Sequence, residues 1–329
     1  MKAALVYDEI TPGGGSWVEA EYESPETIQA LLDALEACCG RAVPIPFRPQ
    51  MVAQLKREAP AVVLNIAEGR AGPSRESLVP AILDFMGIPY AGADGVALGV
   101  SLNKAMTKHL AARAGVPTPE FRLCRTACDA AEAARVLPFP VLVKPNYGGS
   151  SAGIGPQSVV HEPADLIRAV EHCVGAFDQS CLVERFIQGV DVTVGLLGND
   201  PVEPFPAGRI VTPDGMYSEA AKRAHSRNVV CPCALPAGLA EKLEQRSVDA
   251  FGAIGARDFA RVDYMLDADG RAWFLEINPL PGLSPFYGVL PVLAEAAGYD
   301  HAGLIGAIIE RSLERHSQTR SSVHERLAR

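Results

Sequence analysis

The sequence predicts a protein of the α/β and α+β classes, with a parallel α/β domain first, a small α+β domain next and an antiparallel domain last. Three observations lead to this prediction: short apolar strands alternate with amphipathic helices at the start, a glycine-serine loop joins two strands near the middle, and a long hairpin follows. The 329 residues, 48% of them hydrophobic, can fill two or three cores. We place the domains at residues 1–100, 101–182 and 183–329, the last with a polar tail.

The first domain is predicted from the alternation of strands and helices. Apolar segments at 2–7, 61–69 and 88–92 have the composition of buried strands. The segments 25–40 and 77–87 have helical periodicity, and each ends in glycine, a residue that often terminates a helix. Such alternation indicates a parallel sheet with helices on its faces.

The second domain contains a glycine-rich loop. A helix is expected from Ser101, as its N-cap, to Gly115. Farther on, Lys144 ends an apolar strand, and the loop after it contains Gly148, Gly149, Ser150 and Ser151. Backbone N–H groups unobstructed by side chains can fold over phosphates, and a lysine can reach the same anion. An ordinary hairpin is the alternative.

The third domain contains a hairpin with charged residues, at 259–279, around an Ala-Asp-Gly turn. Glu276 and Asn278 are two residues apart and share a face, and counting outward from the turn places Asp263 roughly opposite Glu276. Carboxylate and amide oxygens suit Mg²⁺, so these residues predict a metal site, with a solvated charged hairpin as the alternative. Arg261 shares the face of Asp263 and could neutralise charge on a phosphate there.

The composition excludes some classes of partner. A net charge of −9 and a pI near 5.3 argue against general nucleic-acid and membrane-surface partners. No apolar run reaches 18 residues, and the N-terminal apolar run is too short for a signal sequence, so a cytoplasmic protein is expected. The eight cysteines lack the paired spacing of zinc sites, which predicts free thiols.

Together these motifs resemble the ATP-grasp superfamily, and within it the D-alanine–D-alanine ligases and their relatives. The resemblance spans residues 60 to about 298, and the matching segments are NIAEG, MGIPYAG, SLNKAMTK, GVPTPEF, VLVKPNYGGSSAGI, LVERFIQGVDVTVGLL, ARVDYMLDADGRAWFLEINPLPGLSP and VLAEAAGYD, in the family's order. It implies an ATP-grasp fold with an N-terminal pre-ATP-grasp domain, a central lid domain and a C-terminal catalytic domain. The first 60 residues match only in predicted fold.

The resemblance also implies which residues bind ATP. They are Lys104, Lys144, Gly148, Gly149, Ser150, Ser151, Glu184, Arg185, Phe186, Ile187, Asp191 and Lys222. The lysines would contact the phosphates, with Lys222 on a loop that closes on the γ-phosphate. Glu184 would lie nearest the purine, and Asp191 would bind the ribose hydroxyls.

The resemblance assigns the metal and catalytic residues too. Asp263, Glu276 and Asn278 match the ligands of two Mg²⁺ ions, for which Mn²⁺ can substitute, and Glu276 would bridge the ions. Arg261 and the Gly282 backbone N–H match the groups that stabilise an oxyanion. The implied catalytic set is Arg261, Gly282, Ser150 and Lys222.

The implied activity is an ATP-dependent ligation of a carboxylate to an amine. The carboxylate attacks the γ-phosphate of ATP to give an acyl phosphate, and the amine then displaces the phosphate. The implied substrates are small and amino-acid-like, and a homodimer is the suggested assembly. An intramolecular cyclase of the same fold and a non-catalytic ATP-binding module are the alternatives.

Several residues depart from the substrate pocket of the family. Glu68 stands in place of a histidine, Arg223 in place of a tyrosine, and Tyr287 in place of a serine that contacts the second amino acid. Glu68 could bind an amino group and Arg223 a carboxylate, although positions in a turn and a surface loop explain them equally well. From these departures we expect a product other than D-alanyl-D-alanine. The candidates for the family's substrate-binding glutamate are Glu19, Glu21 and Glu23.

Overall fold

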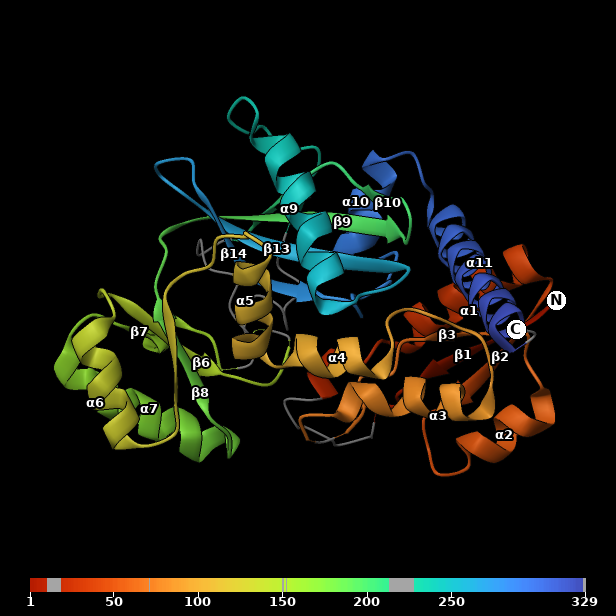
Figure 1. Ribbon diagram of the computed structural model, residues 1–329, viewed down its shortest axis with the longest axis horizontal. Coiled ribbons are helices and arrows are strands. Elements are labelled where there is room, and N and C mark those ends of the chain that lie inside the picture. The colour runs from red at the N-terminus through yellow and green to blue at the C-terminus, as the bar shows by residue number, and fades with distance from the viewer. Residues whose placement is uncertain (11–18, 71, 150, 152, 213–227, 328–329) are drawn as a thin grey trace.

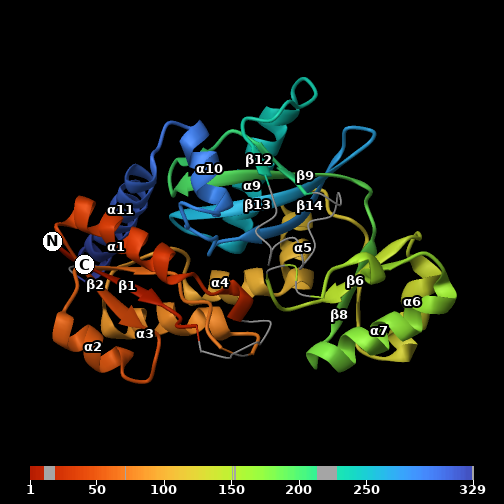
Figure 2. The same cartoon turned by 180° about the vertical axis from the view of Figure 1, so that it is seen from behind.

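The computed structural model describes residues 1–10, 19–70, 72–149, 151, 153–212 and 228–327. Within these residues the strands form three sheets (Figures 1 and 2). An N-terminal sheet lies at one end of the molecule and a small sheet at the other, and a large sheet lies between and above them (Figure 1). This arrangement confirms the α/β and α+β class that the sequence predicts.

The N-terminal sheet is parallel and has the strand order β2-β1-β3-β4. Its strands are β1 (Lys2–Tyr7), β2 (Arg41–Pro46), β3 (Val62–Asn65) and β4 (Tyr90–Ala91). Its helices are α1 (Pro25–Cys39), α2 (Met51–Glu58) and α3 (Leu78–Met86), with 3-10 turns at Glu19–Glu21 and Arg75–Ser77. The predicted strands and helices are confirmed, but β2 and α2 were missed. Two prolines interrupt the apolar pattern of β2, and such residues are tolerated because β2 is an edge strand.

The small sheet is antiparallel, with the order β5-β8-β6-β7. Its strands are β5 (Phe121–Cys124), β6 (Val141–Pro145), β7 (Val159–Val160) and β8 (Cys181–Arg185). Two helices, α6 (Ala127–Val136) and α7 (Pro163–Phe177), cover one face of it (Figures 1 and 2), with a 3-10 turn at Pro156–Ser158. The opposite face of the small sheet is turned toward the large sheet and helix α5.

Two helices, α4 (Gly95–Leu102) and α5 (Lys104–Arg113), connect the N-terminal sheet to the rest of the molecule (Figure 1). The single helix expected to start at Ser101 is therefore wrong. Ser101 lies in the last turn of α4, where its hydroxyl donates to the Leu98 carbonyl. Asn103 has extended backbone angles, and its side chain accepts from the Met106 N–H, so it caps α5. The change of direction at Asn103 aims the first residues of α5 at the centre of the molecule.

The large sheet is antiparallel, with the order β12-β11-β9-β13-β14 and with β10 paired to β9. Its strands are β9 (Gly189–Gly198), β10 (Val202–Pro204), β11 (Gly208–Val211), β12 (Asn228–Val230), β13 (Phe259–Asp267) and β14 (Ala272–Asn278). Its helices are α9 (Leu239–Ile254), α10 (Val289–Ala296) and α11 (His301–Leu327). Helix α9 packs on one face, while α10 and α11 join the other face to α1 in a single apolar core. Helix α11 continues through the segment that was expected to be a polar tail.

A buried carboxylate fastens the N-terminal sheet to the large sheet. Asp258 is fully buried and precedes β13. It accepts hydrogen bonds from the Gly92 N–H after β4 at 2.9 Å and from the Asn199 side chain after β9 at 2.9 Å. Arg315 of α11 donates to it with Nε at 2.9 Å and Nη2 at 2.8 Å. One side chain thus joins three segments that are distant in the sequence.

All eight cysteines are free, as the sequence predicts. In the part of the chain that the structure describes, no single helix is long and apolar enough to cross a membrane. One helix pair, Val289–Ala296 with His301–Gln318, passes that test together by length and composition alone, and it is bent by 95°.

Candidate active site

Two adjacent cavities lie between the sheets. The first, of about 580 Å³, is lined mainly by the small and large sheets, and the second, of about 530 Å³, by the N-terminal domain and the end of β14. Four residues line both cavities: Lys104, Gly148, Gly149 and Glu276. The cavities therefore meet where α5, the glycine loop after β6 and strand β14 come together.

The first cavity gathers most of the residues that the resemblance implies for ATP. They are Lys104, Lys144, Gly148, Gly149, Ser151, Glu184, Arg185, Phe186, Ile187 and Asp191. Ser150 and Lys222 of that set lie outside the described residues, as does Arg223. The rest come from four elements (α5, β6, β8 and β9) and from the loops after β6 and β8, and the fold brings them to one concave surface.

Glu184 lies at the back of the first cavity between two lysines. Its Oε1 is 2.6 Å from Lys144 Nζ and its Oε2 is 2.8 Å from Lys108 Nζ, and all three side chains are buried. Burial alone would raise the pKa of Glu184, but the two ammonium charges outweigh burial and lower this pKa to about 2. Sequence reasoning missed Lys108. The available signal was its spacing of four residues from Lys104, which puts both lysines on one face of α5.

Lys104 contacts both walls at the junction of the cavities. Its Nζ lies 3.2 Å from Glu276 Oε2 on β14, and it donates a hydrogen bond to the Gly148 carbonyl in the glycine loop. Lys104 is buried, so water screens these contacts little. A single ammonium group therefore links the loop to the carboxylate hairpin.

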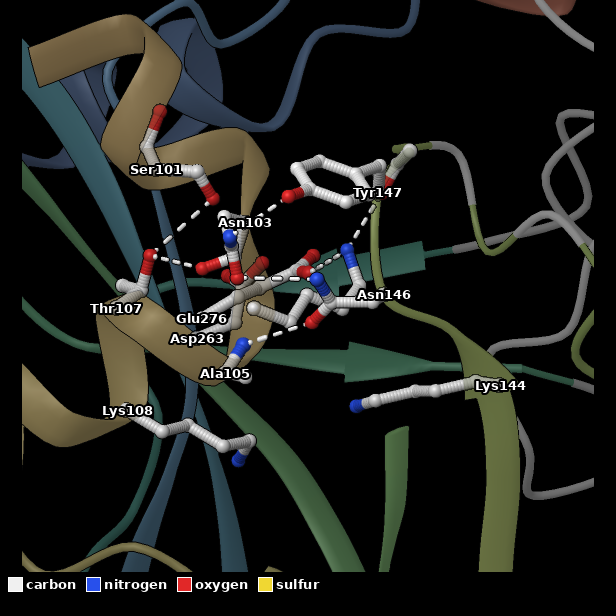
Figure 3. A network of polar contacts seen from close by, with 12 residues as sticks. Ser101, Asn103, Ala105, Thr107, Lys108, Lys144, Asn146, Tyr147, Asp263 and Glu276 are labelled. Carbon is white, nitrogen blue, oxygen red and sulfur yellow. Dashed lines mark hydrogen bonds and ion pairs between the residues drawn. The ribbon is translucent and has the colours of Figure 1, made fainter. Parts of the chain in front are cut away.

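The start of the glycine loop is fastened to the N-terminus of α5 (Figure 3). Asn146 accepts from the Ala105 N–H at 2.9 Å and donates to Asn103 Oδ1 at 3.0 Å. Asn103 in turn donates from Nδ2 to the Tyr147 hydroxyl at 3.0 Å. Because Asn103 also caps α5, the same side chain orients the helix that carries Lys104 and the loop that faces it.

The hairpin of β13 and β14 brings its predicted site residues together. Asp263 is paired with Glu276 and Arg261 with Asn278, which confirms that Asp263 and Glu276 lie roughly opposite each other, and a register shift between Asp263 and Tyr264 makes their pairing direct. The Arg261 guanidinium forms a fork on Asp263, with Nε 2.9 Å from Oδ1 and Nη2 2.8 Å from Oδ2. The Thr193 hydroxyl on β9 donates to the same Oδ1 at 2.7 Å. Asp263 is therefore held in one orientation.

The chemistry of this donor set fits magnesium. Asp263, Glu276 and Asn278 offer only carboxylate and amide oxygens, which are hard ligands. Among the described residues, no group of three or more His, Cys, Asp and Glu side chains is placed to hold a metal. The protein would thus supply two carboxylates and an amide. So small a number of protein ligands suits Mg²⁺, because this ion takes its remaining ligands from water and substrate phosphates.

In the second cavity, Glu23 and Tyr287 meet beside Gly282. The Tyr287 hydroxyl donates to Glu23 Oε2 at 2.5 Å and accepts from the Thr27 hydroxyl at 3.1 Å. A Cβ on Gly282 would lie 3.0 Å from Glu23 Oε1, so the carboxylate packs directly on this glycine. Of the three candidate glutamates, Glu23 is the one that lies at Gly282.

The second cavity also has an acidic wall, formed by Glu21, Glu68 and Glu76 and backed by Arg75. Arg75 Nη2 lies 2.5 Å from Glu21 Oε2 and 3.2 Å from Glu76 Oε1. Burial and the neighbouring carboxylates raise the pKa of Glu68 well above its ordinary value. Burial also raises the pKa of Glu76, to about 7, against the lowering effect of Arg75. Sequence reasoning identified Glu68 but missed Glu76 and Arg75, for which no spacing gave a signal.

Comparison with known proteins agrees with this geometry. A family model described as "D-ala D-ala ligase C-terminus" matches residues 110–310. An uncharacterized protein of Sinorhizobium fredii, y4sG, is 36% identical over 264 residues, which are 78% of this chain and 75% of that relative. A D-alanine–D-alanine ligase of Stutzerimonas stutzeri is 34% identical over 302 residues, which are 92% of this chain and 93% of the relative.

The solved structures include one with a bound nucleotide. The crystal structure of D-alanine–D-alanine ligase from Bacillus anthracis, complexed with ATP, matches with a TM-score of 0.77 at 25% identity. The match covers 97% of this chain and 99% of that one. The chain therefore belongs to the D-alanine–D-alanine ligase family, and it is an ATP-dependent carboxylate–amine ligase with the ATP-grasp fold.

Proposed function

We propose that the protein joins the carboxylate of one small amino acid to the amine of a second, through an acyl phosphate, and so forms a dipeptide. The observation that carries this proposal is the meeting of the two cavities at Lys104 and Glu276. ATP in the first cavity and the amino acids in the second would place the transferred phosphate at that junction. A homodimer stays a prediction.

The first cavity supports the following assignment for ATP. Lys104 and Lys144 bind phosphates, and Asp191 binds the ribose. The segment from Glu184 to Ile187, which covers the end of β8 and the two residues after it, binds adenine. Ser150, Ser151, Gly148, Gly149 and Lys222 complete the phosphate site by sequence resemblance. Burial of the lysines strengthens their attraction for the polyphosphate, because the effective dielectric constant is low there.

Two Mg²⁺ ions are proposed at Asp263, Glu276 and Asn278, with Mn²⁺ as a substitute. When bound, such ions would neutralise charge on the phosphate oxygens. The fork between Arg261 and Asp263 fixes the guanidinium close to these ligands. Arg261 is therefore positioned to stabilise negative charge in the transferring phosphate and in the tetrahedral intermediate.

The reaction follows from these positions. An oxygen of the first carboxylate attacks the γ-phosphorus, the bond to ADP breaks, and an acyl phosphate forms. The nitrogen of the second amino acid, after losing its proton, attacks the acyl carbon, and phosphate leaves with the C–O bonding electrons. The Gly282 N–H and Arg261 would hold the developing oxyanion.

The second cavity favours substrates with ammonium groups. Glu23 lies at Gly282, where the acyl group would react, and the acidic wall lies in the same cavity. Several relatives are named D-alanine–D-alanine ligase, so D-alanine is the first substrate to test. The expectation of a product other than D-alanyl-D-alanine gains no support from these relatives. Arg223 and Tyr287 remain candidate contacts to the second amino acid.

A screen of amino acids with coupled detection of ADP, followed by mass spectrometry of the products, tests this function. ADP formation is expected to require two amino acids or two molecules of one, and the product mass should equal their sum less one water. A product that has lost water from a single substrate molecule would indicate the cyclase instead. Product formation without ATP would overturn the proposal.

The Glu23→Gln variant is expected to raise the KM for the first amino acid on the order of tenfold or more. The reason is that a charge-assisted hydrogen bond to an ammonium group contributes about 1.5–3 kcal/mol. Steady-state kinetics with each substrate varied in turn checks this, with Glu36→Gln, exposed on α1, as the control. Unchanged KM values for both amino acids would contradict the assignment of Glu23.

A further inference from the structure

Lys108 is a fully buried lysine whose ammonium group makes two hydrogen bonds and one ion pair. Its ammonium group lies 2.8 Å from Glu184 Oε2, donates to the Thr118 hydroxyl at 3.0 Å and donates to the Phe274 carbonyl at 3.2 Å. These contacts come from three different directions of the fold and hold the ammonium group in place. It belongs to α5, and its acceptors lie on β8, on β14 and in the segment before β5.

Lys108, Glu184 and Lys144 form a buried charge triad. Each oxygen of Glu184 forms an ion pair with one lysine, so two positive charges face one negative charge, and the net charge is +1. Lys144 and Glu184 line the first cavity, whereas Lys108 lies behind them. Figure 3 shows Lys144 projecting from β6 and Lys108 from α5 toward the same space.

The position of Glu184 creates an electrostatic problem for a site that binds a polyphosphate. Without Lys108, the Glu184 carboxylate would cancel the charge of Lys144, with which it is in contact at 2.6 Å. The polyphosphate would then meet a neutral pair. In a buried site such a loss matters, because charges several ångströms apart interact strongly when water is excluded.

We propose that Lys108 is a positioning residue for ATP, which offsets the Glu184 charge and so keeps the charge of Lys144 available to the phosphates. The inference rests on the proposed binding of ATP in the first cavity. Burial lowers the pKa of Lys108 to about 8; the Glu184 carboxylate opposes this shift and the Lys144 charge adds to it. The ammonium form is therefore retained at neutral pH. Lys108 does not line the first cavity, so it would act on the nucleotide through Glu184 and Lys144 and not by contact.

The sharpest test compares how much the phosphates add to binding. The dissociation constants of MgATP and of adenosine are measured by competition against a fluorescent ATP analogue, in the full-length protein. The dissociation constant of adenosine divided by that of MgATP is the ratio that isolates the phosphate contribution, and it is larger when the phosphates add more to binding. The Lys108→Met variant is expected to lower this ratio on the order of tenfold. The Glu184→Gln variant should raise it, because the triad then carries a charge of +2. In the double variant the ratio should return close to that of the wild type.

The double variant separates a charge effect from a structural one. If Lys108 served only to pack the sheets together, both single substitutions would lower the ratio by disturbing that packing. Their losses of phosphate binding would add in the double variant, and Glu184→Gln would not restore the ratio. The Lys56→Met variant, which removes an exposed lysine on α2, controls for net charge and should leave the ratio unchanged. Should Lys108→Met not fold, Glu184→Gln alone decides, since a ratio that does not rise overturns the inference.

The proposed function and the inference can fail separately. If the wild type shows no MgATP binding, the ATP site itself is wrong. If the wild type binds MgATP but Lys108→Met keeps the full phosphate contribution, only the role of Lys108 is wrong.

Discussion

Replacing Glu276 by glutamine is expected to lower the rate of ligation on the order of 10³-fold. Glu276 lines both cavities, is paired with Asp263 across the hairpin and contacts Lys104 at 3.2 Å. The amide keeps the shape but loses the charge that would hold a cation between ATP and the carboxylate. Metal stabilisation of a transition state contributes several kcal/mol, and about 1.4 kcal/mol corresponds to a tenfold change in rate.

The measurement is single-turnover formation of ADP, together with titration of Mg²⁺. The Asp269→Asn variant is the matched control, since it removes one exposed carboxylate from the turn of the same hairpin. We expect this control to behave like the wild type. Full turnover of Glu276→Gln at the wild-type Mg²⁺ requirement would remove Glu276 from the metal site.

The Asp258→Ala variant is expected to lose about 3–5 kcal/mol of folding stability, because the Arg315 charge, whose side chain is only 16% exposed, loses its carboxylate. The Gly92 N–H and the Asn199 amide lose an acceptor at the same time. The melting temperature should fall on the order of 10 °C, which differential scanning calorimetry would detect.

Backbone strain and loss of the carboxylate can be separated at this position. Asp258 has a φ of 64°, in the left-handed region. Alanine adopts this conformation at an energetic cost, whereas glycine adopts it without one. Asp258→Gly therefore removes the carboxylate without that strain, and it should still lose most of the stability. Asp33→Ala, at an exposed position on α1, is the control. A stable Asp258→Gly protein would show that the carboxylate does not hold the sheets together.

The hairpin shows what sequence reasoning can establish. Counting residues outward from one short turn places Asp263 roughly opposite Glu276, because the register of a hairpin is set locally, whereas the direct pairing of the two needs a register shift between Asp263 and Tyr264 that the count does not contain. Likewise, helix ends at Gly40 and Gly87 follow from the preference of glycine for the left-handed conformation. In each case one short segment contains all the information that is needed.

The triad and the acidic wall show where such reasoning stops. Lys108 and Glu184 lie on α5 and β8, and no local pattern indicates that their ammonium and carboxylate meet. The same holds for Arg75 and Glu21, which come together only when two loops of the N-terminal domain fold against each other. The break at Asn103 was missed because Ser101 is an equally good capping residue in isolation, and packing decides between them.

The arrangement of the two cavities has a consequence for how such a protein can evolve. The acidic wall and Glu23 come from the N-terminal domain, while the residues around Lys144 come from the small sheet. Mutations in one set leave the other set in place, since among the residues that the structure describes the two cavities share only the junction at Lys104, Gly148, Gly149 and Glu276. New amino-acid preferences can therefore arise by drift in the first hundred residues while the phosphate chemistry is inherited unchanged.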